Sequence, residues 1–177
     1  VATVIACSGF AAICGSTAAT AATMGKIALP EMKKYGYDDE LATGTVAAAG
    51  TLGILIPPST VLIVYGILTE ESIGKLFVAG ILPGFLLSLF FIATVIVLCL
   101  RNPDIGPPGP QTTWKQKLRA TTGIIEAVLL FLLTIGGLFL GWFSPTQAGA
   151  IGAFGALAIG VMRRRLRLKI AIEAAKD

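Results

Sequence analysis

Apolar residues along the chain gather into long blocks that are separated by short polar segments. A helix that crosses a bilayer takes roughly 20 apolar residues, and several of these blocks reach that length. The pattern therefore predicts an all-α polytopic membrane protein with polar loops between its spans. The predicted membrane segments are residues 1–29, 41–68, 76–100, 122–142 and 145–162.

The block at residues 41–68 contains an interruption that an ordinary spanning helix does not carry. At its centre is the motif GTLGILIPPST (50–60), in which Pro57 and Pro58 have no backbone N–H. The carbonyls of Gly53 and Ile54 therefore lose their helical donors, and each such proline costs a helix interior about 3 kcal/mol. At membrane depth an unpaired carbonyl persists only where protein, water or a ligand satisfies it. We interpret this block as a broken transmembrane helix.

The first block, residues 1–29, is divided by a small, hydroxyl-rich segment. Val1 to Cys14 is an apolar arm whose length favours a re-entrant segment over a full span. A second arm runs from the Ser16–Thr17 pair, either of which is a good helix N-cap, to about Leu29. The pattern predicts a re-entrant helical hairpin. One long helix remains an alternative, with a packing face of small residues. That face would contain Gly9, Ala12, Ser16, Ala19 and Thr20.

The two backbone irregularities together predict a cation site. Hard cations prefer oxygen ligands, and sodium can be held by neutral carbonyls and hydroxyls without a carboxylate. Secondary transporters bind their coupling ions at discontinuous helices of this kind. A kinked helix that merely packs against its neighbours remains the alternative. The candidate oxygens belong to Ser16, Thr17, Gly53, Ile54, Ile56 and Pro58.

The same irregularities also offer a place for an anion. A helix resumes at Ser59 and Thr60 after the break, and the second hairpin arm begins at Thr17 and Ala18. Helix N-termini present free N–H groups and a partial positive charge. These four residues are therefore the candidates for binding a carboxylate substrate.

Composition excludes several classes of function. Of the 177 residues, 55% are hydrophobic, 14% are charged and none is His, so a His-based catalytic triad or zinc site is excluded within this chain. The net charge of +4 forms no basic patch interleaved with aromatics, which argues against nucleic-acid binding. The three cysteines lie in apolar segments without C-x-x-C spacing and are expected to pack as small hydrophobes. Because the chain begins at Val1 without a signal peptide, we expect an internal piece of a longer protein.

The distribution of Lys and Arg predicts the orientation in the membrane. Basic residues concentrate at 101–119 and 163–169, so both segments are expected in the cytoplasm. Counting spans from there places 143–146 and 69–75 outside and 33–40 in the cytoplasm. Residues 166–177 predict the start of an amphipathic interfacial helix.

Four motifs in order resemble one transporter family. They are STAATAATMGKIALPEMKKYGYD (16–38), GTLGILIPPS (50–59), LFVAGILPG (76–84) and GWFSPTQA (141–148). The chain resembles the large membrane subunit, DctM type, of tripartite ATP-independent periplasmic (TRAP) transporters. The resemblance covers essentially the whole chain but only the middle of such a subunit.

The resemblance implies an elevator-type transporter half in a bacterial or archaeal inner membrane. It implies two partners, a small DctQ-type membrane subunit and a periplasmic DctP-type solute-binding protein that delivers the substrate. Na⁺ would be the coupling ion, with no other cofactor, and the substrates would be organic acids such as C4-dicarboxylates or sialic acid. By position, the family's sodium site falls on Ser16, Thr17, Gly53, Ile56 and Pro58.

The resemblance also implies a division of labour along the chain. Residues 1–100 would be half of the moving transport domain, 101–120 a cytoplasmic loop, and 121–177 part of the scaffold with the start of its arm helix. Two alternatives from other classes are a membrane-embedded enzyme and a channel or structural subunit. An enzyme would need convergent catalytic side chains at membrane depth, and no His, Asp or Arg lies in the middle of a predicted span. A channel would need a polar stripe along a pore, whereas the polar groups here collect at two backbone breaks.

Overall fold

The computed structural model describes residues 1–107 and 114–162, and every element in these ranges is helical. The chain divides into two compact units, Val1–Gln111 and Thr112–Asp177. The predicted all-α architecture is confirmed for the described residues. The assignment of the two parts to a transport domain and a scaffold stays a prediction.

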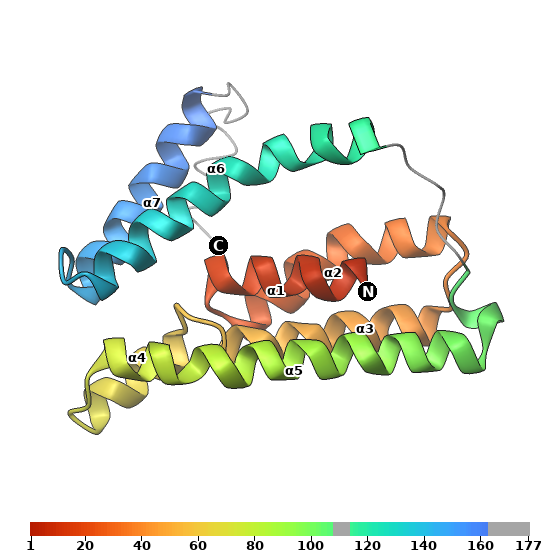
Figure 1. Cartoon of the computed structure of the whole chain (residues 1–177), viewed down its shortest axis with the longest axis horizontal. Helices are drawn as coiled ribbons and strands as arrows, with labels where there is room; N and C mark the ends of the chain where they lie inside the picture. The colour runs from red at the N-terminus through yellow and green to blue at the C-terminus, as the bar shows by residue number, and fades with distance from the viewer. Residues whose placement is uncertain (108–113, 163–177) are drawn as a thin grey trace. The chain divides into compact units, whose positions relative to one another are not determined.

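The first unit contains five α-helices and two short 3₁₀ helices (Figure 1). Helix α2 packs along α3, α1 lies against both, and α5 runs beside α3 and α1. In chain order the elements are α1 (Ala2–Cys14), α2 (Thr17–Lys34), α3 (Asp39–Gly50), η1 (Thr51–Ile54), α4 (Thr60–Leu68), α5 (Ile73–Arg101) and η2 (Pro103–Ile105).

The core of this unit lies where α1, α2 and α3 meet. Small side chains let the helices approach closely, and a few larger ones fill the remaining space. The side chains of α5 cover this core from one side, including Leu87 and Phe91. The buried core residues are Val4, Cys7, Ala11, Met24, Val46, Ala49 and Leu52.

The first block forms two helices, so the alternative of a single long helix is wrong. Gly15 adopts the left-handed conformation (φ 63°), which ends α1, and α2 begins at Thr17. The second arm does not end near Leu29 as predicted; α2 continues through Pro30 to Lys34. Pro30 is exposed, and beyond it Met32 receives a hydrogen bond from the Thr3 hydroxyl of α1. Contact between α2 and α1 therefore continues beyond the proline. Re-entry of this hairpin into a membrane stays a prediction.

The second block is interrupted, as its prolines predict. Helix α3 ends at Gly50, the 3₁₀ helix η1 follows, and α4 begins only at Thr60. The start of α3 is capped by Asp38, whose Oδ1 accepts from the N–H groups of Glu40 (2.9 Å) and Leu41 (3.1 Å). The block therefore forms two short helices, α3 and α4, in place of one continuous spanning helix.

The second unit is a pair of helices, α6 (Trp114–Phe139) and α7 (Pro145–Met162). The prediction that 101–120 is a loop is wrong beyond Trp114: the Pro- and Gly-rich part ends at Pro110, and the polar residues that follow are good helix formers. Helix α6 also stops before the predicted end at Trp142, because Gly141 is left-handed (φ 74°). The predicted interfacial helix at 166–177 lies outside the described residues.

Ser144 caps the start of α7. Its Oγ accepts from the N–H of Gln147 (3.3 Å), and its own N–H donates to Oε1 of Gln147 (2.9 Å). This reciprocal pair satisfies two backbone donors at the helix start.

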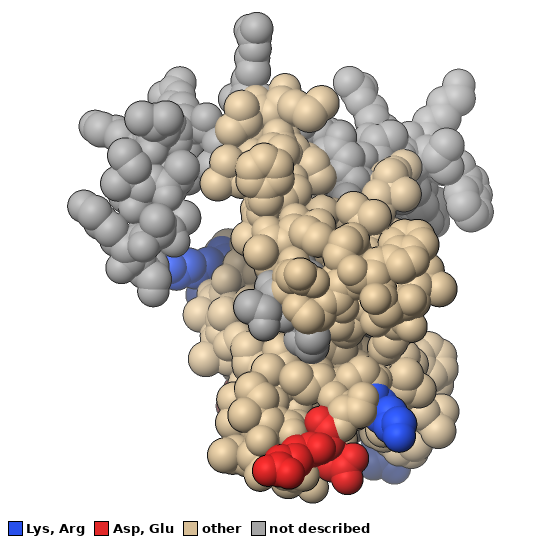
Figure 2. Space-filling view, turned by 90° about the vertical axis from the view of Figure 1, so that its left-hand side faces the viewer, with Lys and Arg blue, Asp and Glu red and all other residues tan. Residues whose placement is uncertain are grey.

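Among the described residues, α5 is the one helix both long and apolar enough to cross a membrane. Shorter apolar helical segments occur at Ala2–Cys14, Val128–Phe139 and Ala150–Met162. Large apolar side chains such as Leu82, Phe85 and Leu100 are exposed on α5. On the face shown in Figure 2, uncharged residues cover most of the described surface, and the few acidic side chains lie together near one end.

Candidate functional site

The turn between α1 and α2 is a tight two-residue connection. The N–H of Gly15 donates to the Ala11 carbonyl (2.9 Å), which closes the last turn of α1. Ser16 is extended, and its Oγ accepts from the N–H of Ala19 (3.4 Å), so it is the N-cap of α2. The Ser16 carbonyl accepts from both the N–H (3.0 Å) and the hydroxyl (2.7 Å) of the fully buried Thr20. The hairpin tip is therefore rigidly held from the α2 side.

The break between α3 and α4 leaves a run of main-chain oxygens without hydrogen-bond donors. The Leu52 carbonyl accepts from the N–H groups of Leu55 (3.1 Å) and Ile56 (2.9 Å), which closes η1. The Pro57–Pro58 bond is cis, and neither proline has an N–H to donate. Within the described residues, no hydrogen-bond donor reaches the carbonyls of residues 53–58. Sequence reasoning predicted this for Gly53 and Ile54, and the structure extends it to the whole turn.

Ser59 begins α4 in the same way that Ser16 begins α2. It is extended, its Oγ accepts from the N–H of Leu62 (3.4 Å), and its side chain is fully buried. Both serines use their hydroxyl oxygen as a cap acceptor, and neither hydroxyl proton has an acceptor among the described residues. The capped N-termini of α2 and α4 therefore lie directly after the two irregular segments, the turn between α1 and α2 and the break between α3 and α4.

The hairpin tip touches the break directly. The Gly15 carbonyl accepts from both the N–H (3.1 Å) and Oγ1 (3.0 Å) of Thr60. A Cβ on Gly15 would collide with the carbonyl oxygen of Pro58. A Cβ on Gly53 would lie 2.9 Å from the Ser16 carbonyl carbon and 3.0 Å from the Thr17 nitrogen. Only glycine at these two positions lets the two main chains come this close.

Most residues of the predicted cation site meet at this contact. Gly53 lies against Ser16 and Thr17, and Pro58 lies against the residue before Ser16. Ile56 differs, because its main-chain nitrogen and its side chain lie close to α5. Their role in binding sodium stays a prediction.

The predicted carboxylate-binding residues are not equivalent. Thr60 donates both its N–H and its hydroxyl to Gly15, so these two donors are already used. The N–H groups of Thr17 and the exposed Ala18, in the first turn of α2, reach no acceptor in the described part of the chain. Among the described residues, the donors of this region without an acceptor are therefore these two N–H groups and the buried hydroxyl of Ser59, and of the three residues only Ala18 is exposed.

Sequence reasoning missed Gly15, which makes the strongest link between the two segments. The signal for it was present: a glycine at the end of an apolar arm, directly before a Ser–Thr pair, is typical of a left-handed helix C-cap. What the sequence does not show is that its carbonyl meets Thr60, a residue 45 positions away.

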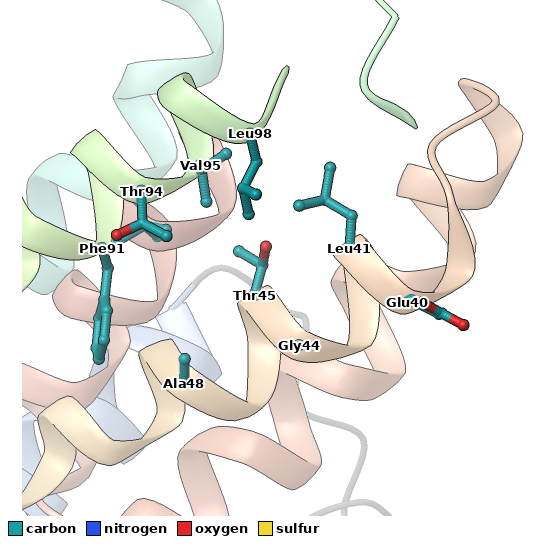
Figure 3. A pocket seen from close by; sticks show the side chains of 10 residues that line it. Glu40, Leu41, Gly44, Thr45, Ala48, Phe91, Thr94, Val95 and Leu98 are labelled. Carbon is teal, nitrogen blue, oxygen red and sulfur yellow. The ribbon is translucent and has the colours of Figure 1, made fainter. Parts of the chain in front are cut away.

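A hollow between α3 and α5 lies at the other end of α3 from the break (Figure 3). Its volume is about 250 Å³, and its wall is mostly apolar. Leu41, Thr45 and Ala48 of α3 face Phe91 and Val95 of α5 across it. Glu40 points away from it in Figure 3, so its wall offers little to an ion.

The chemistry at the break is that of neutral oxygens. In the part of the chain that the structure describes, no three His, Cys, Asp or Glu side chains come together as metal ligands. The groups near the hairpin tip and the break are main-chain carbonyls, hydroxyls and helix N–H groups. This set suits a monovalent cation, which is less strongly hydrated than a divalent metal, and a carboxylate.

Comparison with known proteins identifies the family. The model of the DctM component of the tripartite ATP-independent periplasmic transporter matches residues 1–176. The chain belongs to the DctM family. This membership of a transporter family rules out the alternative of a membrane-embedded enzyme.

Several curated DctM relatives are similar to the chain over most of its length. It is 39% identical to the C4-dicarboxylate TRAP transporter large permease protein DctM of Pseudomonas aeruginosa, over 99% of the chain and 42% of that protein. It is 36% identical to the ectoine/5-hydroxyectoine TRAP transporter large permease protein UehC of Ruegeria pomeroyi, over 92% of the chain and 37% of the relative. It is also 36% identical to the sialic acid TRAP transporter permease protein SiaT of Haemophilus influenzae, over 85% of the chain and 24% of that protein. The chain thus spans less than half the length of these DctM relatives.

Proposed function

We propose that the chain is part of the large permease of a sodium-coupled transporter that imports organic acids across a bacterial or archaeal inner membrane. Membership of the DctM family supports the transporter class. The substrates named for its relatives include C4-dicarboxylates, sialic acid and ectoines, which carry a carboxylate, and isethionate, which carries a sulfonate. A negatively charged oxygen group, a carboxylate in most of these substrates, is therefore what we expect the site to recognise.

The contact between the hairpin tip and the helix break is the observation that carries the sodium part of this proposal. Carbonyl oxygens in residues 53–58 have no donor within the described residues, and Ser16 and Thr17 lie against Gly53. In a low-dielectric environment such oxygens need a partner. A sodium ion between the tip and the break would satisfy them, with Ser16, Thr17, Gly53, Ile56 and Pro58 as candidate ligands.

The substrate would bind beside this ion, at the starts of α2 and α4. The N–H groups of Thr17 and Ala18 and the hydroxyl of Ser59 reach no acceptor among the described residues, which favours an anion there, and the positive ends of both helices add to this. Thr60 would contribute by holding Gly15, because its own donors are occupied. Sodium bound at the adjacent carbonyls would raise the affinity for a carboxylate, which couples the two ligands.

The family name implies further components. We propose that the full-length subunit works with a small DctQ-type membrane subunit and a periplasmic DctP-type binding protein. We also propose that residues 1–100 move as half of the transport domain, with the hairpin of α1 and α2 re-entering the membrane, and that residues 121–177 belong to the scaffold. In this arrangement the remainder of the full-length subunit would complete the substrate site.

Uptake into proteoliposomes tests the proposal. The full-length large subunit, its small subunit and a substrate-loaded binding protein would be assayed with sodium outside, then with sodium replaced by potassium. We expect uptake of a labelled carboxylate to require both sodium and the binding protein. Equal uptake in potassium would contradict sodium coupling. Non-saturating flux without the binding protein would instead indicate a channel.

A further inference from the structure

Helix α5 contacts the helix break through two buried glycines. A Cβ built on Gly80 would lie 2.6 Å from the carbonyl oxygen of Leu55. One built on Gly84 would lie 3.0 Å from Cγ1 of Ile56 and 3.5 Å from its main-chain nitrogen. Two glycines one helical turn apart let the backbone of α5 approach the main chain of the break closely, with the side chain of Leu62 also 3.2 Å from a Cβ built on Gly80. The break is thus enclosed by α5 as well as by the hairpin tip.

This contact holds the peptide between Leu55 and Ile56 from both edges. On one edge, the N–H of Ile56 donates to the Leu52 carbonyl (2.9 Å). On the other, the Leu55 carbonyl lies against Gly80. Because a peptide unit is rigid and planar, fixing both edges sets its rotation. The carbonyls of Ile54 and Ile56 belong to the two neighbouring peptide units, so a shift of this peptide would displace both.

We propose that Gly80 and Gly84 are positioning residues of the cation site: they orient the carbonyls of the break without supplying a ligand. This inference rests on the sodium coupling proposed above. The Leu55 carbonyl faces α5 and is not among the ligands. A methyl group on Gly80 would force this oxygen or α5 to move by several tenths of an ångström. Metal–ligand distances tolerate only about 0.2 Å.

Three alanine variants of α5 in the full-length, assembled transporter form the test. Gly80→Ala meets a main-chain oxygen, Gly84→Ala meets a side chain that can shift, and Gly74→Ala meets only Ser72 Oγ, at 3.9 Å. For Gly80→Ala we expect the sodium concentration at half-maximal uptake to rise about 10-fold or more, as on loss of a group that orients metal ligands. Gly84→Ala should show a smaller rise, and the matched control Gly74→Ala no change.

Two further readouts separate positioning from folding. The substrate concentration at half-maximal uptake, measured in saturating sodium, should stay near wild type in Gly80→Ala. The clash at Gly80 should lower the melting temperature of the purified subunit, and this measurement reports the effect on folding separately from the sodium curve. A normal sodium curve in both Gly80→Ala and Gly84→Ala overturns the proposal. If Gly80→Ala does not assemble, Gly84→Ala decides: a raised sodium requirement supports the role and an unchanged one contradicts it. If uptake by the wild-type protein does not depend on sodium concentration, the proposed function is contradicted, and this inference with it.

Discussion

The carbonyl oxygen of Gly15 accepts two hydrogen bonds from Thr60, one from its backbone N–H (3.1 Å) and one from its hydroxyl (3.0 Å). These residues belong to different irregular segments, the turn of the N-terminal hairpin and the start of the helix after the break. The pair joins the two segments into one structural unit. Any ligand held between them therefore depends on this link.

The hydroxyl of Thr60 can be removed without changing the size of its side chain. Thr60→Val loses the bond from Oγ1 but keeps the bond from the N–H, so we expect the full-length protein to lose about 1 kcal/mol of stability. The hairpin tip should also be held less firmly against the break, which would raise the sodium concentration needed for half-maximal uptake. Thermal unfolding and sodium-dependent uptake measure the two effects. Thr60→Ser keeps the hydroxyl and is the control; equal losses in both variants would contradict a role for this hydrogen bond.

Gly15 is expected to be intolerant of any side chain. Gly15→Ala places a Cβ on the Pro58 carbonyl and forces a non-glycine residue into the left-handed conformation, which alone costs about 1–2 kcal/mol. The melting temperature should fall, and sodium-dependent uptake should be lost. Gly9→Ala is the matched control, because a Cβ there meets nothing within 4 Å and alanine favours a helix by up to about 1 kcal/mol. A similar change in melting temperature for Gly15→Ala and Gly9→Ala would contradict the close contact between the hairpin tip and the helix break.

The sequence predicts local breaks well and tertiary contacts poorly. Pro57 and Pro58 forbid helical hydrogen bonds whatever surrounds them, and Ser16 before a helix-forming run predicts a cap, so both irregularities could be read from the chain. The prediction that the second arm ends near Leu29, before Pro30, is wrong. Helix α2 continues and contacts α1 beyond this proline, a contact that no local pattern shows. The glycine contacts of Gly15 and Gly53 also stay hidden, since they depend on how two distant segments meet.

The two prolines of the break are expected to be needed for sodium coupling. Replacing Pro57 and Pro58 by Ala restores two N–H groups that can bond to the carbonyls of Gly53 and Ile54. A continuous helix would then consume the oxygens proposed to face sodium, so sodium-dependent uptake should be abolished. Pro30→Ala is the control: this proline is exposed inside α2, and its replacement should leave the sodium curve unchanged. Normal sodium affinity in the double variant would contradict the proposal that the cation binds at the break.

Ser16 has two roles that a matched serine can separate. Ser16→Ala removes the N-cap of α2, which typically costs about 1 kcal/mol, and also removes a hydroxyl proposed to contact sodium. Ser72 caps α5 in the same way, at 3.5 Å from the N–H of Lys75, but has no part in the proposed site. Ser16→Ala and Ser72→Ala should both lower the melting temperature. Only Ser16→Ala should raise the sodium concentration needed for half-maximal uptake. An unchanged sodium curve would exclude the Ser16 hydroxyl as a ligand.

The orientation in the membrane can be tested with two single cysteines. Asp39 and Glu71 are exposed at opposite ends of the broken helix, and Asp39 forms a surface ion pair with the exposed Lys33 (3.5 Å), so either can be replaced at little cost. Cys7, Cys14 and Cys99 would first be replaced by Ala to remove the background. Because basic residues favour the cytoplasm, we expect a membrane-impermeant thiol reagent to label Asp39→Cys only from the cytoplasmic side and Glu71→Cys only from the periplasm. The opposite labelling would invert the topology, and labelling of both from one side would show that residues 39–71 do not cross the membrane.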